Sequence, residues 1–490
     1  MKSVFRATAI LSGSSAVSIV VGLVSSRILA GILHPAGYGY YGLLQSFVLV
    51  ASMFVGMGVA TGIVRLGATA AKENNQARMA ALCGGAWLLV AALGIPVLIL
   101  MAIFRRELSI WALGTPDHAG AMAVMVFALL FTVALNVQNG ILNAWHRVEA
   151  LAAYGIVNSI FNAGAPVLCV LLWKDEGVVP GVVLGAVLGW MASRFFLFRS
   201  VGRSSVKPTW SERLAAAREL VSFGIPYVAS YTAGQGVTLA MPMVVVHLLD
   251  ADGVGYYKAS SAIAVSYLSF LVTAMAQDYY PRISSVREQP RAMVNLINEQ
   301  TRLIMLLAAP AILFTLALVP IIVPILYSRS FMPTVAILEW QLIGDLFKFS
   351  SWTLSYAILA RCKPSVYLMT ESFNGVVTIS CTWLAVHQFG LQGLGIGFIA
   401  STFLYLLFVW IVLRREIPLA WTRQNIQLLL MAVTAAAVVR VVHWTPFDSY
   451  RMAIAFVLAT GFGIFSIRKL WHEFKSEKQS SNTPQTPAAA

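Results

Sequence analysis

The sequence predicts an all-α polytopic membrane protein, and three observations lead to this prediction. Hydrophobic residues make up 59% of the 490 residues and charged residues only 11%, the apolar residues form long runs, and Lys and Arg fall mainly between these runs. A soluble domain has roughly 45–50% apolar and about 25% charged residues, so a water-soluble core could not bury this excess. The composition therefore excludes a soluble enzyme, a disordered scaffold and a disulfide-rich secreted module.

Fourteen apolar runs are long enough to be membrane spans, since a helix needs about 20 apolar residues to cross the hydrocarbon core. The first run is too long for the apolar region of a signal peptide, and we interpret it as a retained helix. The expected spans cover Thr8–Leu33, Tyr40–Val64, Met79–Phe104, Ala119–Ala144, Ala150–Trp173, Gly177–Phe198, Leu220–Leu249, Val254–Tyr280, Leu303–Tyr327, Thr334–Ala360, Val366–Gln388, Leu391–Leu413, Ile426–Val442 and Tyr450–Leu470.

The distribution of Lys and Arg predicts the orientation of these spans. With the N-terminus in the cytoplasm, 24 of the 34 basic residues fall on the cytoplasmic side, 6 on the opposite side and 4 within spans, as the positive-inside rule requires. Arg440, near the end of the expected span Ile426–Val442, is counted among the 6. We therefore expect both termini in the cytoplasm. The net charge of +14 is explained by this asymmetry, and no nucleic-acid partner is expected, because the basic residues do not cluster on one face.

A repeated motif divides the chain into two similar halves. The sequence Gly-Tyr-Gly-Tyr-Tyr at 37–41 matches Gly-Val-Gly-Tyr-Tyr at 253–257, an offset of 216 residues that other glycines share. Six spans separate the copies, which predicts parallel repeats related by an axis along the membrane normal and enclosing a central cavity. The expected domains are an N-terminal six-helix bundle (1–200), a basic cytoplasmic linker on the anionic inner surface (201–219), a C-terminal six-helix bundle (220–415), two additional helices (416–472) and a disordered cytoplasmic tail (473–490).

Basic residues inside spans are the first candidates for a functional site, because a charge at a helix centre costs at least about 2.5–3.5 kcal/mol. Arg27, Lys258 and Lys348 occur in spans of both halves, which favours a cationic cavity for an anionic substrate. The alternative for Arg27 and Lys258 is that they extend to the outer headgroups. The alternative for Lys348 is a local ion pair with Asp345, one turn earlier.

Acidic residues in or near the same spans are candidates for charge compensation or for ion coupling with H+ or Na+. Asp278 is also spaced to pair with Arg282 at the inner end of a span, and Glu371 could instead extend toward the inner surface. The candidates are Asp345, Glu339, Glu371 and Asp278.

Polar side chains at helical spacing predict an aqueous cavity. Asn136, Asn139 and Asn143 share one face of a helix, and amides facing lipid would be costly. Such groups suit sugar hydroxyls, whereas the alternative is hydrogen bonding between helices. The expected sugar-facing residues are Asn136, Asn139, Asn143, Asn158, Asn162, Tyr231 and Gln235.

Signatures of enzymes, metals and cofactors are not found. The four cysteines occur singly, so neither a disulfide nor a zinc site is expected. The glycines at 390–397 occur without a βαβ unit and indicate close helix packing rather than nucleotide binding. We find no Walker loop and no His-Glu-x-x-His motif, and the expected outer loops are too short for a catalytic domain. The sequence therefore predicts a transporter that needs no cofactor and no metal.

Three segments resemble the Wzx-type flippases of O-antigen and enterobacterial common antigen, a family of polysaccharide exporters in the multidrug/oligosaccharidyl-lipid/polysaccharide exporter superfamily. They are Phe331 with the run Trp340–Lys348 (WQLIGDLFK), residues 26–29 (SRIL) with 35–39 (PAGYG), and 280–284 (YPRIS). The resemblance implies movement of undecaprenyl-diphosphate-linked oligosaccharides from the cytoplasmic to the outer leaflet of the bacterial inner membrane. It also implies functional roles for Arg27, Asp345 and Lys348. The family often has twelve spans, two fewer than counted here.

The sequence therefore predicts a lipid-linked oligosaccharide flippase working by alternating access, with the diphosphate on Arg27, Lys258 and Lys348. Expected partners are the lipid-linked oligosaccharide, membrane lipids, H+ or Na+ as a coupling ion and other polysaccharide assembly proteins. Three alternatives stand: a lipid II-type flippase, a multidrug or cation antiporter of the same superfamily, and a membrane-bound glycan polymerase or ligase.

Overall fold

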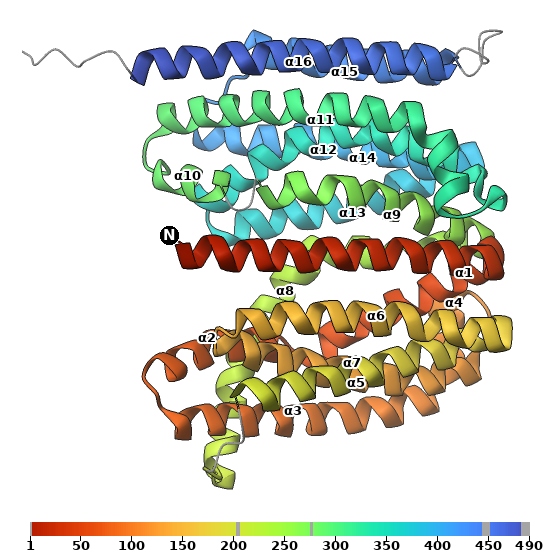
Figure 1. The fold of residues 1–490 in the computed structure, drawn as a ribbon, viewed down its shortest axis with the longest axis vertical. Coiled ribbons are helices and arrows are strands. Elements are labelled where there is room, and N and C mark those ends of the chain that lie inside the picture. Colours follow the sequence, from red (N-terminus) through yellow and green to blue (C-terminus); the bar gives the residue numbers. More distant parts are fainter. Residues whose placement is uncertain (1, 202–205, 275–277, 443–450, 482–490) are drawn as a thin grey trace, which may run out of the picture. The chain divides into compact units, whose positions relative to one another are not determined.

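The computed structural model describes residues 2–201, 206–274, 278–442 and 451–481, and within these ranges the chain is helical with no β-strand (Figure 1). The all-α polytopic fold expected from the sequence is confirmed. Two compact units emerge from the internal contacts, and each is described by itself. The first contains residues 1–259 and 324–331, and the second contains 260–323 and 332–490.

Among the described residues, each expected span corresponds to one or more helices. The first part of the chain forms α1 (Lys2–Gly56), α2 (Val59–Lys72), α3 (Gln76–Ile103), α4 (Arg105–Leu113), α5 (Ala119–Ala144), α6 (Val148–Trp173), η1 (Lys174–Gly177), α7 (Val178–Val201), α8 (Trp210–Leu248) and α9 (Ala251–Ala274). The remainder forms α10 (Tyr280–Ser285), α11 (Pro290–Leu326), η3 (Arg329–Phe331), α12 (Pro333–Arg361), α13 (Pro364–Phe389), η4 (Gly390–Gln392), α14 (Gly393–Glu416), α15 (Arg423–Val442) and α16 (Arg451–Ser481).

The first expected span and most of the second lie in α1, on either side of a kink at His34 (φ 54°, ψ −176°). Pro35 follows, and a proline disfavours the helical conformation at the residue before it. The second span is itself interrupted, because Met57 (φ 42°) and Gly58 (φ 66°) leave the helical region between α1 and α2. Its expected range, Tyr40–Val64, therefore contains a helix break that the sequence did not predict.

Glycine at Gly58 and Gly224 explains how this break is packed. Both the positive φ of Gly58 and its surroundings favour glycine, since a methyl group there would lie 2.7 Å from the carbonyl oxygen of Gly224 in α8. A methyl group at Gly224 would in turn overlap the carbonyl oxygen of Met57. The break and α8 are therefore in direct backbone contact.

Two helix ends differ from the expected domain limits. α8 begins at Trp210, inside the expected linker 201–219, because Thr209 and Glu212 form a capping box. α16 continues to Ser481, beyond the expected start of the tail at Glu473, and residues 482–490 lie outside the described part of the chain.

The offset of 216 residues reappears in backbone geometry. The hairpin α6–η1–α7 turns at Lys174 (φ 52°, ψ −129°), and the hairpin α13–η4–α14 turns at Gly390 (φ 56°, ψ −133°). Just after these turns, each hairpin has a glycine that approaches the backbone of the preceding helix. Gly177 approaches Cys169, and Gly393 approaches Ala385, which is 216 residues after Cys169. The two hairpins are thus built alike.

The two copies of the glycine-tyrosine motif contact each other within the first unit. A methyl group at Gly39 would lie 2.8 Å from the nitrogen of Gly255, and one at Gly255 would lie 3.0 Å from the Cα of Pro35. Gly39 also approaches the carbonyl oxygen of Ala251, the counterpart of Pro35. Such reciprocal contact between equivalent residues is what a two-fold relation produces.

Candidate functional site

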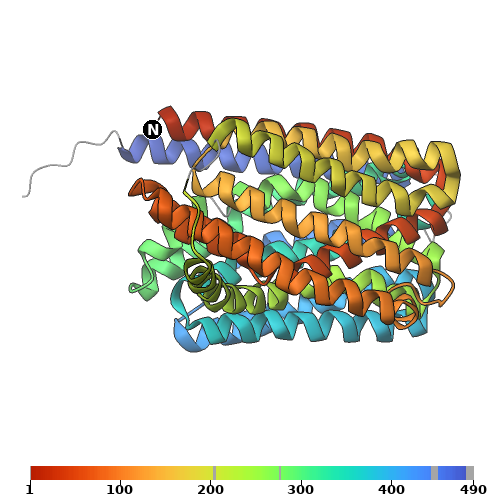
Figure 2. The ribbon, with the colours of Figure 1, turned by 90° about the horizontal axis from the view of Figure 1, so that it is seen from below.

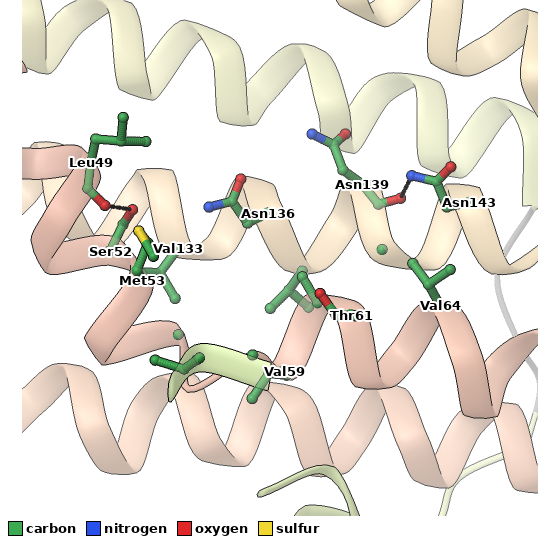
Figure 3. Close-up of a pocket in the computed structure, with 16 residues that line it drawn as sticks. Leu49, Ser52, Met53, Val59, Thr61, Val64, Val133, Asn136, Asn139 and Asn143 are labelled. Atoms are coloured by element: carbon green, nitrogen blue, oxygen red, sulfur yellow. Dashed lines mark hydrogen bonds between the residues drawn. The ribbon is translucent and has the colours of Figure 1, made fainter. Parts of the chain in front are cut away.

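A cavity of about 460 Å³ lies in the first unit, between α5, the break in the second span and α8 (Figure 3). Its polar wall is the stripe Asn136, Asn139 and Asn143 of α5, and the backbone of the break forms part of the opposite wall. The other lining residues are Leu49, Ser52, Met53, Gly56, Gly58, Val59, Ala60, Thr61, Val64, Val133, Val137, Gly140 and Val228.

The three asparagines are held differently. Asn139 is half-buried and its Oδ1 accepts a hydrogen bond from Ser193 Oγ of α7 at 3.3 Å. Asn143 Nδ2 donates to the backbone oxygen of Asn139 at 3.1 Å, while the side chains of Asn136 and Asn143 are exposed. Amides both donate and accept hydrogen bonds, so this wall can bind ligand hydroxyl groups in either sense.

Asn158 and Asn162 lie elsewhere, at the contact between α6 and α7. Asn162 Nδ2 donates to the backbone oxygen and Oδ1 of Asn158 at 3.0 and 2.8 Å, and a methyl group at Gly189 of α7 would lie 2.5 Å from Asn158 Oδ1. They are not among the lining residues of this cavity, and Asn162 is exposed while Asn158 is half-buried. Tyr231 and Gln235 lie in α8, and their side chains are outside the described part of the structure.

Lys258 is a half-buried cation in the first unit. Its Nζ donates to Ser46 Oγ at 2.7 Å, and its aliphatic chain lies over Gly42, where a methyl group would be 2.8 Å from Lys258 Cε. Gly42 precedes Lys258 by the repeat offset, so glycine in one copy makes room for the lysine of the other. Arg27, in the same unit, is exposed on α1.

Lys348 is a half-buried cation in the second unit. Its Nζ lies 5.2 Å from the ring centroid of Trp352 and 5.4 Å from that of Phe398, distances at which a cation is attracted to an aromatic face. Asp345, one turn earlier on α12, is 1% exposed.

Glu339 contacts a basic residue that the sequence analysis had counted on the outer side. Arg440 Nε lies 3.4 Å from Glu339 Oε2, with 2% of Arg440 exposed. Arg440 also donates to Gln392 Oε1 at 3.2 Å and lies 5.1 Å over the ring of Trp340. α15 ends at Val442, the limit of the expected span, and the side chain of Arg440 in its last turn is buried rather than exposed at an outer surface. Glu339 itself was the available signal, since a buried carboxylate needs a partner.

The remaining acidic candidates lie in two further environments of the second unit. Glu371 Oε1 accepts a hydrogen bond from the hydroxyl of Tyr405 at 2.7 Å, and that hydroxyl lies 2.9 Å from Ser355 Oγ. Asp278 is exposed and pairs with Arg282 at 3.2 Å, and Arg282 also pairs with Glu299 at 3.0 Å.

An aromatic cluster in the first unit was not predicted from the sequence. The ring of Tyr38, just after the α1 kink, lies 5.6 Å from that of Tyr327 and 5.7 Å from that of Phe331, and Tyr256 lies 6.1 Å from Phe331. The segment 324–331 joins the first unit through this cluster. Tyr38 and Tyr256 belong to the repeated motif, but residues so far apart in sequence gave no sign of meeting Phe331.

A multi-pass helical bundle with an amide-lined cavity and basic residues in its spans defines a membrane transporter. The chain belongs to the polysaccharide biosynthesis protein family, whose sequence profile matches residues 28–336. Two curated relatives, the lipid III flippases of Escherichia coli (strain K12) and Shigella flexneri, are each 21% identical over 411 residues, covering 82% of this chain and 96% of the relative.

Solved structures share the fold. The lipid II flippase MurJ, in an inward closed conformation, has a TM-score of 0.69 at 14% identity. The match covers 94% of this chain and 99% of the MurJ chain. An inward-facing multidrug resistance MATE family transporter of the MOP superfamily has a TM-score of 0.66 at 15% identity, covering 82% of this chain and 94% of that one. These relatives are flippases and transporters, and this chain is a transporter rather than an enzyme.

Proposed function

We propose that the protein is a flippase for an undecaprenyl-diphosphate-linked oligosaccharide, moving repeat units of an O-antigen-like surface polysaccharide from the cytoplasmic to the outer leaflet of the bacterial inner membrane. The observation that carries this proposal is the cavity with its wall of Asn136, Asn139 and Asn143, in a member of the polysaccharide biosynthesis protein family. A cavity of about 460 Å³ is of the size that binds small organic groups, and amides match sugar hydroxyls.

The diphosphate is assigned to the cations Arg27, Lys258 and Lys348. Outward movement of negative charge releases about 2.3 kcal/mol per charge per 100 mV of inside-negative potential, so the potential alone can drive a diphosphate outward. Asp345, Glu339, Glu371 and Asp278 are the carboxylates assigned to charge compensation or to H+ or Na+ coupling. Both termini are placed in the cytoplasm, following the positive-inside pattern.

Depletion of the protein in its native host tests the function directly. We expect lipid-linked intermediates to accumulate in the inner leaflet while surface glycan is lost, measured by extraction and by labelling of the cell surface. A complementing plasmid with the unaltered gene is the control. Normal surface glycan after depletion would refute the proposal.

Variants test the cationic site in the same assay. Arg27→Ala and Lys348→Ala should each reduce export, and Gly42→Ala should reduce it as well, because the added methyl group displaces the chain of Lys258. Gly31→Ala is the matched control in α1, since a methyl group there contacts nothing within 4 Å. Full export by all three variants at normal protein levels would contradict the assignment.

A second candidate substrate is lipid II, because MurJ shares the fold at a TM-score of 0.69. The two substrates can be separated by complementation. Rescue of a strain lacking its lipid II flippase, without rescue of one lacking its lipid III flippase, would assign lipid II instead.

A further inference from the structure

A groove of about 480 Å³ lies outside the proposed transport site, where the beginning of α8 packs on α3. In Figures 1 and 2 the first turns of α8 lie beside the beginning of α3. The groove belongs entirely to the first unit. It is lined by Ala80, Cys83, Gly84, Trp87, Leu88, Val206, Pro208, Trp210 and Arg213.

Two adjacent glycines of α3 create this groove. Gly85 lets α8 approach closely, since a methyl group there would lie 2.7 Å from the nitrogen of Ala217. Gly84 leaves the space that the chain of Arg213 enters, because a methyl group there would lie 2.9 Å from Arg213 Cγ. The side chain of Arg213 is therefore held in the groove instead of extending into solvent.

The groove is cationic, because both acidic residues of this stretch are engaged elsewhere. Glu212 accepts hydrogen bonds from Thr209 N at 2.7 Å and from Thr209 Oγ1 at 2.9 Å. These bonds lower the pKa of Glu212 and keep it ionised as the helix cap. Glu219 pairs with Arg78. Among the described residues, Nε of Arg213 is buried and has no hydrogen-bond partner.

The groove combines one charged side chain, Arg213, with mostly apolar walls. Arg213 and Pro208 contact α3 at Gly84, where a methyl group would lie 2.9 Å from Arg213 Cγ and 3.2 Å from Pro208 Cγ, and Trp87 and Leu88 follow about one turn farther along the helix. At 1.5 Å per residue, Ala80 and Leu88 are about 12 Å apart along the axis. Trp210 is 65% exposed, and tryptophan is enriched at the level of lipid headgroups. The groove thus matches a molecule with an anionic end and a hydrocarbon end.

We propose that this groove binds one anionic phospholipid from the leaflet on the side of residues 199–219. The phosphate accepts hydrogen bonds from the Arg213 guanidinium, and the first methylenes lie against Trp87 and Leu88. Charge complementarity selects this occupant, because a neutral acyl chain would leave the buried Nε of Arg213 without an acceptor. The site is independent of the transported substrate.

The test uses Cys83, which lines the groove, as a reporter in the full-length protein. The protein is reconstituted in nanodiscs of phosphatidylcholine alone or with phosphatidylglycerol, and N-ethylmaleimide modification is followed by peptide mass spectrometry. Cys362, at the end of α12, is the internal reference for effects of surface potential. We expect phosphatidylglycerol to slow modification of Cys83 several-fold relative to Cys362.

Variants and a soluble anion identify the occupant. Arg213→Gln should abolish the protection, whereas Arg218→Gln, which removes an exposed cation of the same helix outside the groove, should retain it. If the unaltered protein shows the same rate of Cys83 modification relative to Cys362 in nanodiscs with and without phosphatidylglycerol, the proposal is overturned. Protection by inorganic phosphate in phosphatidylcholine nanodiscs would assign the groove to a soluble anion and overturn it too.

Discussion

At the scale of single residues, the buried pair of Glu339 and Arg440 shows what a membrane-spanning bundle does with opposite charges. Both side chains are nearly inaccessible, at 4% and 1% exposure, so each would be a costly isolated charge without the other. Arg440 also contacts Gln392 and Trp340. The pair therefore joins α15, one of the two helices outside the expected repeats, to α12.

Removal of one partner should destabilise the protein strongly. Glu339→Gln leaves the Arg440 charge buried and should lower the free energy of unfolding by about 3–5 kcal/mol, measured by denaturant titration in detergent. The double variant Glu339→Leu/Arg440→Met removes both charges and should regain most of this loss. A loss of less than about 1 kcal/mol in the single variant, typical of surface pairs, would contradict the buried assignment.

The asparagine stripes show how far residue patterns predict a site. Spacing correctly indicates that Asn136, Asn139 and Asn143 share a face, and that face lines a cavity. Asn158 and Asn162 also share a face, but they lie beside Gly189 of α7 and do not line this cavity. Helical periodicity gives the residues on a face, whereas the element that covers the face depends on tertiary packing, which one sequence does not contain.

At the scale of elements, hydropathy predicts spans better than it predicts interruptions within them. The limits of α5 coincide with the expected span Ala119–Ala144, because polar segments flank it on both sides. No polar segment surrounds the break at Met57 and Gly58, so hydropathy predicts one continuous second span. Gly224 of α8 packs against this unwound backbone, and a contact with a distant helix leaves no local signal in the sequence.

Substitution at this contact should be costly. Gly224→Ala places a methyl group against the carbonyl oxygen of Met57, and overpacking of this kind typically costs about 1–3 kcal/mol, measured by thermal unfolding in detergent. Gly164→Ala in α6 is the control, because a methyl group there meets nothing within 4 Å. That change should be neutral or stabilise by about 0.5–1 kcal/mol. Equal stability of both variants would show that the contact is looser than described.

At the scale of the whole molecule, the duplication is the feature that the sequence predicts best. Matches at one offset of 216 residues correspond to matching hairpin turns and to reciprocal contacts at Gly39 and Gly255. The aromatic cluster of Tyr38, Tyr256, Tyr327 and Phe331 could not be predicted in the same way. It brings a segment from late in the chain against the first motif, and no repeat spacing indicates that contact.

Division of the chain between the halves tests the reciprocal contact. The two halves are produced together as separate polypeptides, residues 1–201 and 206–490. They should co-purify, because the close contact of Gly39 with Gly255, here called the crossing, joins them without a covalent connection. Gly39→Leu in the first piece should weaken recovery of the second, measured by affinity capture in mild detergent, and Gly22→Leu is the control on the same helix. Capture unaffected by Gly39→Leu would contradict a role for the crossing.

The crossing has a consequence for the origin of Lys258. Had a half-length ancestor paired with itself, a lysine at this position would have occurred twice beside the symmetry axis, with two like charges competing for one space. Gene fusion removes that constraint, since each copy can then mutate alone. One copy now carries Gly42 and the other carries Lys258. Because Gly42 has no side chain, the chain of Lys258 occupies the space beside it. The single lysine at this position is therefore a result of divergence between the two fused copies.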